Sequence, residues 1–202
     1  MIRWTSRLLP AVALAAAATL PLQAEEMEAP AIGEAAPAFT LTNAEGEDVS
    51  LSDFAGQTLV IQFQSCQCPW DVAYQPYLNA LAEEFSDDDV VFLGINSNKA
   101  ETYDTIAAYN AGENQGVAYE VLKDPGNAVA DAFGAKTTPH MYVIDGDGVL
   151  RYRGGIEAVP GGMQQVGQME EQFLGPVLAA LVDGSEPPYT ETTSKGCSIK
   201  RE

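Results

Sequence analysis

The stretch VIQFQSCQCPWD, residues 60–71, decides how the rest of the chain is arranged. It begins as a short apolar run, the pattern of a buried strand, and then supplies two cysteines, a proline and an aromatic residue. Residues 72–85 follow with apolar side chains at helical spacing. Pro69 suits a first helical turn, where its missing N–H leaves no hydrogen bond unmade. The pattern therefore predicts that Cys68 stands at the N-terminus of a helix that follows a buried strand.

This position favours a reactive thiol at Cys68. The partial positive charge of a helix N-terminus stabilises a thiolate and lowers the pKa of the thiol. A thiolate is the form of cysteine that attacks disulfides and peroxides. The plainer alternative is a structural cysteine that packs like a small hydrophobic residue. The strand-to-helix position favours the reactive interpretation.

The composition fits one globular domain with extensions: 202 residues, 46% hydrophobic and 19% charged. The formal net charge is −19. Nucleic-acid binding requires clustered Lys and Arg to neutralise phosphates, so this acidity argues against a nucleic-acid partner. We interpret the acidity as a solvated surface.

The first 24 residues have the pattern of a secretory signal peptide. Arg3 and Arg7 form a basic start, residues 8–22 are apolar and alanine-rich, and Ala24 is a small residue suited to cleavage. The apolar run is shorter than the ~20 residues that a spanning helix needs. We therefore expect a periplasmic protein whose mature chain is not inserted in the membrane. The periplasm is an oxidising compartment in which disulfides persist.

Beyond the signal, the sequence predicts a flexible leader over residues 25–36, one domain over 37–183 and a polar tail over 184–202 that carries Cys197. Within the domain, strand and helix patterns alternate, which favours an α/β layer fold. After a hairpin over residues 38–51, the predicted strands span residues 58–64, 90–95, 119–122, 141–144 and 149–152. The predicted helices span residues 71–86, 101–111, 127–133 and 166–181. The last of these helices is expected to be kinked or split in two at residues 175–176.

This order of elements resembles the thioredoxin fold, with a Cys-Pro pair at a helix start and a later Thr-Pro pair before a hairpin. The N-terminal hairpin around residues 39–54 is similar to that of the redoxin branch, the alkyl hydroperoxide reductase/thiol-specific antioxidant group. The GCSIK ending at residues 196–200 resembles that of some peroxiredoxin-like proteins of this fold. The likeness covers roughly residues 33–182. It implies a central mixed sheet flanked by helices, with an N-terminal β-hairpin extension.

The resemblance also implies a function and a site. It implies thiol–disulfide exchange or thiol-dependent peroxide reduction without an organic cofactor, with a thiol or disulfide protein as electron donor or substrate. Cys68 matches the attacking cysteine, and Pro139, preceded by Thr138, matches the proline, usually cis, that faces it. Ser65 matches the Ser or Thr that peroxiredoxins place three residues before their cysteine. Asp71 stands where thioredoxins have their second cysteine, so the usual C-x-x-C pair is absent.

Two cysteines are candidates to resolve an oxidised Cys68. Cys66 gives a C-x-C pair, whose small disulfide ring is strained and readily reduced. It shares a face with Cys68 if the strand continues that far. Cys197 lies far along the chain on a tail expected to be mobile, but the entropy of loop closure grows only slowly with length. The GCSIK ending slightly favours Cys197.

Two other classes of function remain open at this stage. Cys66, Cys68 and His140, the only histidine, form a possible Cys₂His site with ligands soft enough for copper. This arrangement resembles the Sco-type copper chaperones, although their cysteines are spaced C-x-x-x-C. The third class is a catalytically silent binding module on the same fold.

The signal peptide gives the first testable prediction. N-terminal sequencing of the exported protein should begin at or near Glu25, because the basic start and apolar run direct export and cleavage. Recovery of an intact Met1 on a membrane-bound form would contradict this prediction.

Overall fold

A mixed five-stranded sheet organises the part of the chain that the computed structural model describes, residues 29–112 and 116–201. The strand order is β5-β4-β3-β7-β8, with β3 parallel to β4 and antiparallel to β7. The strands are β3 (Thr58–Phe63), β4 (Val90–Asn96), β5 (Val121–Lys123), β7 (His140–Ile144) and β8 (Leu150–Gly154). The expected thioredoxin-like fold with a central mixed sheet is confirmed.

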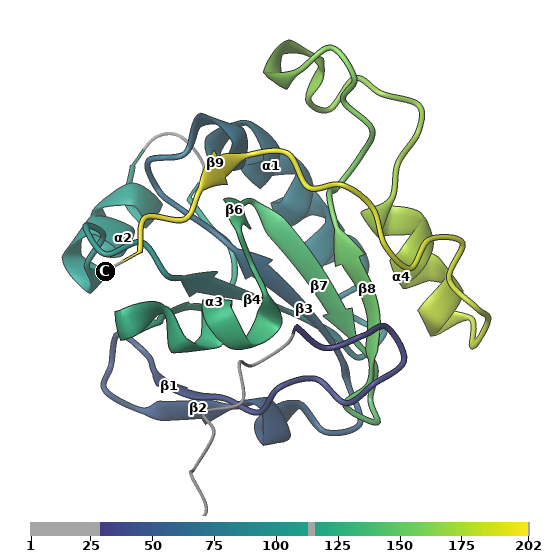
Figure 1. Cartoon of the computed structure of the whole chain (residues 1–202), viewed down its shortest axis with the longest axis horizontal. Coiled ribbons are helices and arrows are strands. Elements are labelled where there is room, and N and C mark those ends of the chain that lie inside the picture. Colours follow the sequence, from purple (N-terminus) through teal and green to yellow (C-terminus); the bar gives the residue numbers. More distant parts are fainter. Residues whose placement is uncertain (1–28, 113–115, 202) are drawn as a thin grey trace, which may run out of the picture.

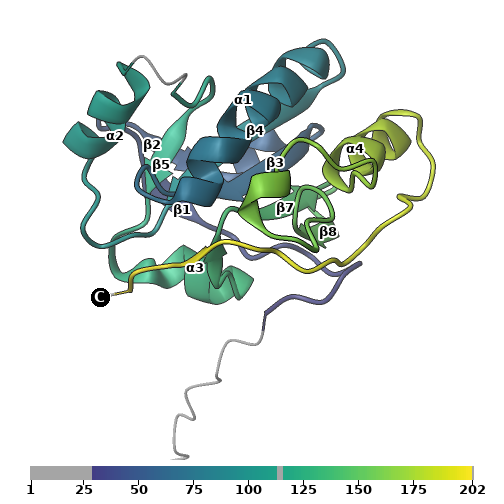
Figure 2. The same cartoon turned by 90° about the horizontal axis from the view of Figure 1, so that it is seen from above.

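Helices cover both faces of this sheet (Figures 1 and 2). α1 (Pro69–Glu84) and α4 (Leu174–Val182) lie on one face, and α3 (Ala128–Phe133) lies on the other. α2 (Tyr103–Asn110) lies beside β5, where its Ile106 packs in a small apolar cluster. No helix of the described residues is long and apolar enough to cross a membrane.

The central strand β3 is buried on both faces, as strands of parallel sheets usually are. Leu59, Ile61 and Phe63 pack in the cluster around α3, and Val60 packs in the cluster around α1 and α4. Gln62 interrupts this apolar run and is fully buried. A buried amide needs hydrogen-bond partners, and Gln62 finds them at the start of α1, beneath Cys68.

The predicted N-terminal hairpin is present as β1 (Thr40–Thr42) and β2 (Asp48–Ser50). The flexible leader expected over residues 25–36 is wrong for residues 29–36. There, Gly33 N–H donates to the Leu150 carbonyl and Ala36 N–H to the Gly148 carbonyl, so this segment is fastened to the β7–β8 hairpin. Residues 25–28 and the predicted signal peptide, residues 1–24, lie outside the described residues.

The helix predicted over residues 166–181 is wrong in its first half, because α4 begins only at Leu174. Pro176 has no N–H to donate to residue 172, and its ring would clash with that residue's carbonyl in a continuous helix. Instead, the N–H groups of Phe173 and Leu174 both donate to the Ile156 carbonyl, which fixes where α4 starts.

The C-terminal tail lies against the domain, so the expectation of a mobile tail is wrong for the described residues 184–201. Its strand β9 (Cys197–Ser198) pairs antiparallel with β6 (Thr137–Thr138), and Cys197 lies opposite Thr138. Figure 1 shows this yellow segment crossing the molecule beside β6. The next residue, Ile199, is 7% exposed and joins the core cluster around α3.

Removal of the Ile199 side chain should release the tail. Ile199→Ala deletes buried apolar atoms that hold β9 against the domain, so trypsin should cut after Lys195 faster than in the wild type. The matched control, Ile199→Val, keeps most of the buried surface and should be cut at close to the wild-type rate. Equal cleavage of all three proteins would show that Ile199 does not anchor the tail.

Candidate active site

The turn that joins β3 to α1 places Cys68 as the N-cap residue of α1, with Pro69 at the first helical position. The predicted strand-to-helix position is therefore confirmed. The buried carboxylate of Asp71 holds this turn: its two oxygens accept from Gln62 Nε2 at 2.8 Å and from Ser65 N–H at 3.0 Å. Cys68 is only 2% exposed.

A second buried carboxylate, Glu101, also stabilises this turn by accepting hydrogen bonds from its residues. It accepts from Ser65 Oγ at 2.6 Å, from Cys66 N–H at 3.0 Å and from Asn96 Nδ2. Sequence reasoning missed Glu101. The signal was topological: residues after β4 lie at the same sheet edge as residues after β3, because the two strands are parallel.

The surroundings of the Cys68 sulfur favour its thiolate. Burial raises the pKa of Cys68, but hydrogen bonds to the sulfur from the Cys197 thiol and the Asp71 N–H act in the opposite direction, and the net pKa lies below the ordinary value. In the thiol form, Sγ donates to the Thr138 carbonyl at 2.9 Å. The Thr138–Pro139 peptide bond is cis, as the resemblance implies.

The pKa of the Asp71 carboxyl group is in turn changed by the charge on the Cys68 sulfur. Burial, and after it the negative charge of Cys68, raise the pKa of Asp71 well above its usual range. Asp71 therefore retains a proton more readily than an exposed aspartate, which limits repulsion of the thiolate. Its backbone N–H stabilises the thiolate while its side chain positions the turn.

Cys197 lies next to Cys68, because β9 pairs with β6. Gly196 makes this approach possible: a Cβ atom there would lie 2.1 Å from the Thr138 carbonyl oxygen, closer than any real contact. Burial, and then the interaction with Cys68, raise the pKa of Cys197 to about 11. Cys197 is thus a protonated neighbour that donates to the Cys68 thiolate.

A small hollow of about 170 Å³ opens onto both sulfurs. Its lining combines the β3–α1 turn, the segment after β4, β6 and the tail. The residues that line it are Ser65, Gln67, Cys68, Asn98, Glu101, Thr138, Cys197, Ser198 and Lys200.

Cys66 does not line this hollow. β3 ends at Phe63 and a turn follows, so the strand does not continue to bring Cys66 onto the face of Cys68, and that expectation is wrong. The Cys66 side chain packs instead with the apolar cluster of Ile106 and Val121. Burial, and then the Glu101 charge, raise its pKa to about 12, which disfavours a thiolate at physiological pH.

The structure does not assemble the copper site considered above. His140 lines a different hollow, together with Lys136 and Arg153, and its ring lies 4.7 Å from that of Tyr142. Burial, and then the positive charge of Arg153, lower its pKa to about 4. Among residues 29–112 and 116–201, no three His, Cys, Asp or Glu side chains are grouped so that they could hold a metal ion.

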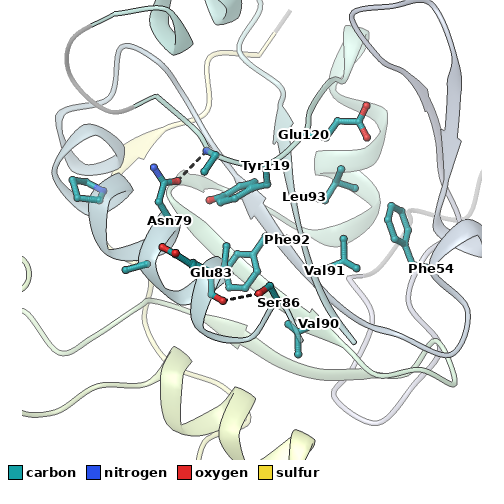
Figure 3. Close-up of a pocket in the computed structure, with 14 residues that line it drawn as sticks. Phe54, Asn79, Glu83, Ser86, Val90, Val91, Phe92, Leu93, Tyr119 and Glu120 are labelled. Atoms are coloured by element: carbon teal, nitrogen blue, oxygen red, sulfur yellow. Dashed lines mark hydrogen bonds between the residues drawn. The ribbon is translucent and has the colours of Figure 1, made fainter. Parts of the chain in front are cut away.

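A larger groove, of about 780 Å³, lies between α1 and β4 (Figure 3). Phe92 and Tyr119 contribute rings to it, and Asn79 and Glu83 contribute polar groups from α1. None of its lining residues is a cysteine or a histidine. Cys68 and Cys197 line the smaller hollow at the N-terminus of α1 and not this groove.

The fold and the cysteine at the helix start define a thioredoxin-fold thiol oxidoreductase. The sequence model of the AhpC/TSA family matches residues 32–153, and the chain belongs to this family. It is 26% identical over 142 residues to the thiol-disulfide oxidoreductase ResA of Halalkalibacterium halodurans, over 70% of this chain and 74% of that protein. A Mycobacterium tuberculosis protein named as a peroxiredoxin is 32% identical over 126 residues, which span 59% of this chain and 73% of the relative.

Two solved structures resemble more of the chain than the family match covers. A hypothetical protein of Sinorhizobium meliloti has a TM-score of 0.75 and 27% identity, and covers 87% of this chain and 97% of its own. An uncharacterized conserved protein of Geobacillus kaustophilus also has a TM-score of 0.75, with 30% identity and coverages of 85% and 93%.

The pKa differences among the three cysteines predict their order of alkylation. Because the pKa of Cys68 is lowered while those of Cys66 and Cys197 are raised to about 12 and 11, iodoacetamide at mildly acidic pH should label Cys68 first. Peptide mass spectrometry of the reduced protein measures this order, and Cys68→Ser should abolish the early labelling. Equal labelling of the three thiols would contradict it.

Proposed function

We propose that this thiol oxidoreductase is exported to the periplasm and works with Cys68 as nucleophile and Cys197 as resolving cysteine. One observation carries the proposal: the β6–β9 pairing holds the Cys197 thiol against the Cys68 sulfur, which is buried at the N-terminus of α1. The two groups needed for a dithiol–disulfide cycle thus meet without a C-x-x-C motif. The export step rests on the sequence pattern of residues 1–24.

The cycle follows from thiolate chemistry. The Cys68 thiolate attacks one sulfur of a disulfide, or one oxygen of a hydroperoxide, and the other sulfur or oxygen leaves and takes up a proton. Cys197 then attacks the mixed disulfide or sulfenic acid at Cys68. This second step forms a Cys68–Cys197 disulfide and releases a thiol or water. Two electrons have then passed from the cysteine pair to the substrate.

The surrounding groups support each step. The N-terminus of α1 and the Asp71 N–H stabilise the thiolate before attack. The Thr138 carbonyl faces the Cys68 sulfur, and Thr137 and Thr138 hold β9 in register. The cis peptide bond to Pro139 follows directly after Thr138. Asp71 and Glu101 are positioning residues, because they act on the turn that carries Cys68.

A thiol protein is the proposed electron donor or acceptor, since the relatives named thiol-disulfide oxidoreductases exchange electrons between such groups. No organic cofactor is needed for this exchange. A silent binding module is disfavoured because the hydrogen bonds around Cys68 stabilise its reactive ionisation state.

Disulfide mapping tests the pairing. One equivalent of oxidant should link Cys68 to Cys197 and leave Cys66 free, because Cys66 packs outside the hollow. Non-reducing digestion and mass spectrometry identify the linked peptides. Cys197→Ser should lower turnover with a thiol reductant by about tenfold or more, whereas the matched variant Cys66→Ser should retain most of it. A Cys66–Cys68 link with Cys197 free would overturn this assignment.

A further inference from the structure

The central strand β3 carries one fully buried polar side chain in an apolar run, the amide of Gln62. Both ends of this amide are hydrogen-bonded. Nε2 donates to Asp71 Oδ1 at 2.8 Å and to Gln75 Oε1 at 3.4 Å, and Oε1 accepts from the Tyr119 hydroxyl. An apolar residue at position 62 would take these partners from Asp71 and Tyr119, and a buried polar group left unpaired is unfavourable. Gln62 therefore connects the polar groups on either side of it.

The hydrogen bonds of this group run in one direction, toward Asp71. Gln75 Nε2 donates to the Tyr119 hydroxyl oxygen at 3.3 Å, and the hydroxyl in turn donates its proton to Gln62 Oε1. Because Tyr119 engages the oxygen of the Gln62 amide, the amide presents its N–H group to Asp71. Burial raises the pKa of Tyr119, so the hydroxyl keeps the proton that fixes this direction. Hydrogen bonds arranged head to tail polarise and strengthen one another.

The Asp71 carboxyl group contacts both this chain of hydrogen bonds and the surroundings of Cys68. Its second oxygen accepts from the Ser65 N–H at 3.0 Å, and the Thr138 hydroxyl interacts with both Asp71 and Cys68. An N–H donor stabilises an ionised carboxylate, and the Gln62 amide acts on Asp71 in this direction. Burial and the charge of Cys68 act in the opposite direction. The ionisation of Asp71 thus depends on the Gln62 amide as well as on the sulfur.

Other ionisable groups lie near the same carboxyl group. The Asp71 charge also acts on two further cysteines and two tyrosines: Cys66, Cys197, Tyr109 and Tyr119. The pKa of each of these four groups is raised, so all four keep their protons at neutral pH. The carboxylate of Glu101 accepts instead from Ser65, Cys66 and Asn96. Near neutral pH, proton exchange at this site therefore concerns Asp71 and Cys68.

We infer that Tyr119 and Gln62 form a positioning chain that acts on Cys68 through Asp71 and sets which of the two groups, carboxyl or thiol, holds their shared proton. This inference rests on the proposed function, since Cys68 is its nucleophile. With one proton on the pair, either a neutral carboxyl group faces a thiolate or a carboxylate faces a thiol. The Gln62 N–H favours the second state, because it stabilises negative charge on Asp71. The chain therefore restrains thiolate formation at Cys68.

The first measurement titrates the Asp71 carboxyl group directly. The reduced, otherwise unchanged protein carries aspartate labelled with carbon-13 at Cγ, and the NMR signal of Asp71 is identified by its loss in Asp71→Asn. Gln62→Met replaces the amide with an apolar side chain of similar length and should move this titration to higher pH by about one unit. Tyr119→Phe removes only a hydroxyl and should move it in the same direction by a smaller amount.

The second measurement follows the thiolate itself. Because Asp71 holds the shared proton more tightly in Gln62→Met, iodoacetamide at mildly acidic pH should alkylate Cys68 about threefold faster or more than in the wild type. A purely structural role of Gln62 would not raise this rate. If the alkylation rate stays at the wild-type value or falls, the chain does not set the state of Cys68 and the inference is overturned.

The matched control is Gln75→Met, the same replacement one helical turn from Asp71. Gln75 is 1% exposed, and its amide donates to Asn79 and Tyr119, which line the larger groove (Figure 3), and not to Asp71. The Asp71 titration should therefore move by less than about 0.3 pH unit. Equal shifts in Gln62→Met and Gln75→Met, or no shift in either, would overturn the inference.

A double-mutant cycle tests whether the chain acts through Asp71. In an Asp71→Asn background the carboxyl group is absent, so Gln62→Met should change the alkylation rate of Cys68 by less than about 1.5-fold. An effect as large as in the wild type would overturn the inference, because the chain would then act on Cys68 by another route. The reaction of wild-type Cys68 with a disulfide is measured separately. If Cys68 does not react, the proposed function fails, whereas the Asp71 titration still tests the chain.

Discussion

A thiolate removed from water must be surrounded by hydrogen-bond donors, because burying an unpaired charge is very unfavourable. Cys68 meets this constraint with donors from two distant parts of the chain: the Asp71 N–H at the N-terminus of α1, and the Cys197 thiol. The sheet brings these parts together, since β3 delivers the cysteine and β6 presents the strand on which Cys197 lies. The site therefore depends on the contact between the β3–α1 turn, which carries Cys68, and β6, which pairs with the strand of Cys197.

Two buried carboxylates give that turn its shape. Asp71 and Glu101 accept hydrogen bonds from the side chain or backbone of Ser65, and Glu101 also accepts from the N–H of Cys66. The buried oxygens are thus satisfied, and the turn is held from both sides. The raised pKa of Asp71 favours the neutral form of its carboxyl group, which limits repulsion between Asp71 and the Cys68 thiolate.

The cysteine pair of this chain is assembled by tertiary contacts between distant segments. In a C-x-x-C motif the second thiol is placed by local helix geometry, and here Asp71 fills that position. The C-terminal tail supplies the second thiol instead, and Gly196 allows the tail backbone to lie against the Thr138 carbonyl.

The sequence by itself determined the order of strands and helices, the N-terminal hairpin and the position of Cys68, because these features depend on local periodicity and on Pro69. It could not locate the start of α4, which depends on hydrogen bonds to the distant Ile156 carbonyl. It left Cys66 and Cys197 as alternatives and missed Asn98 and Glu101. Only the tertiary structure decided which of these residues surround Cys68, because pairing between β6 and β9 and contacts across the sheet edge join residues that no sequence period relates.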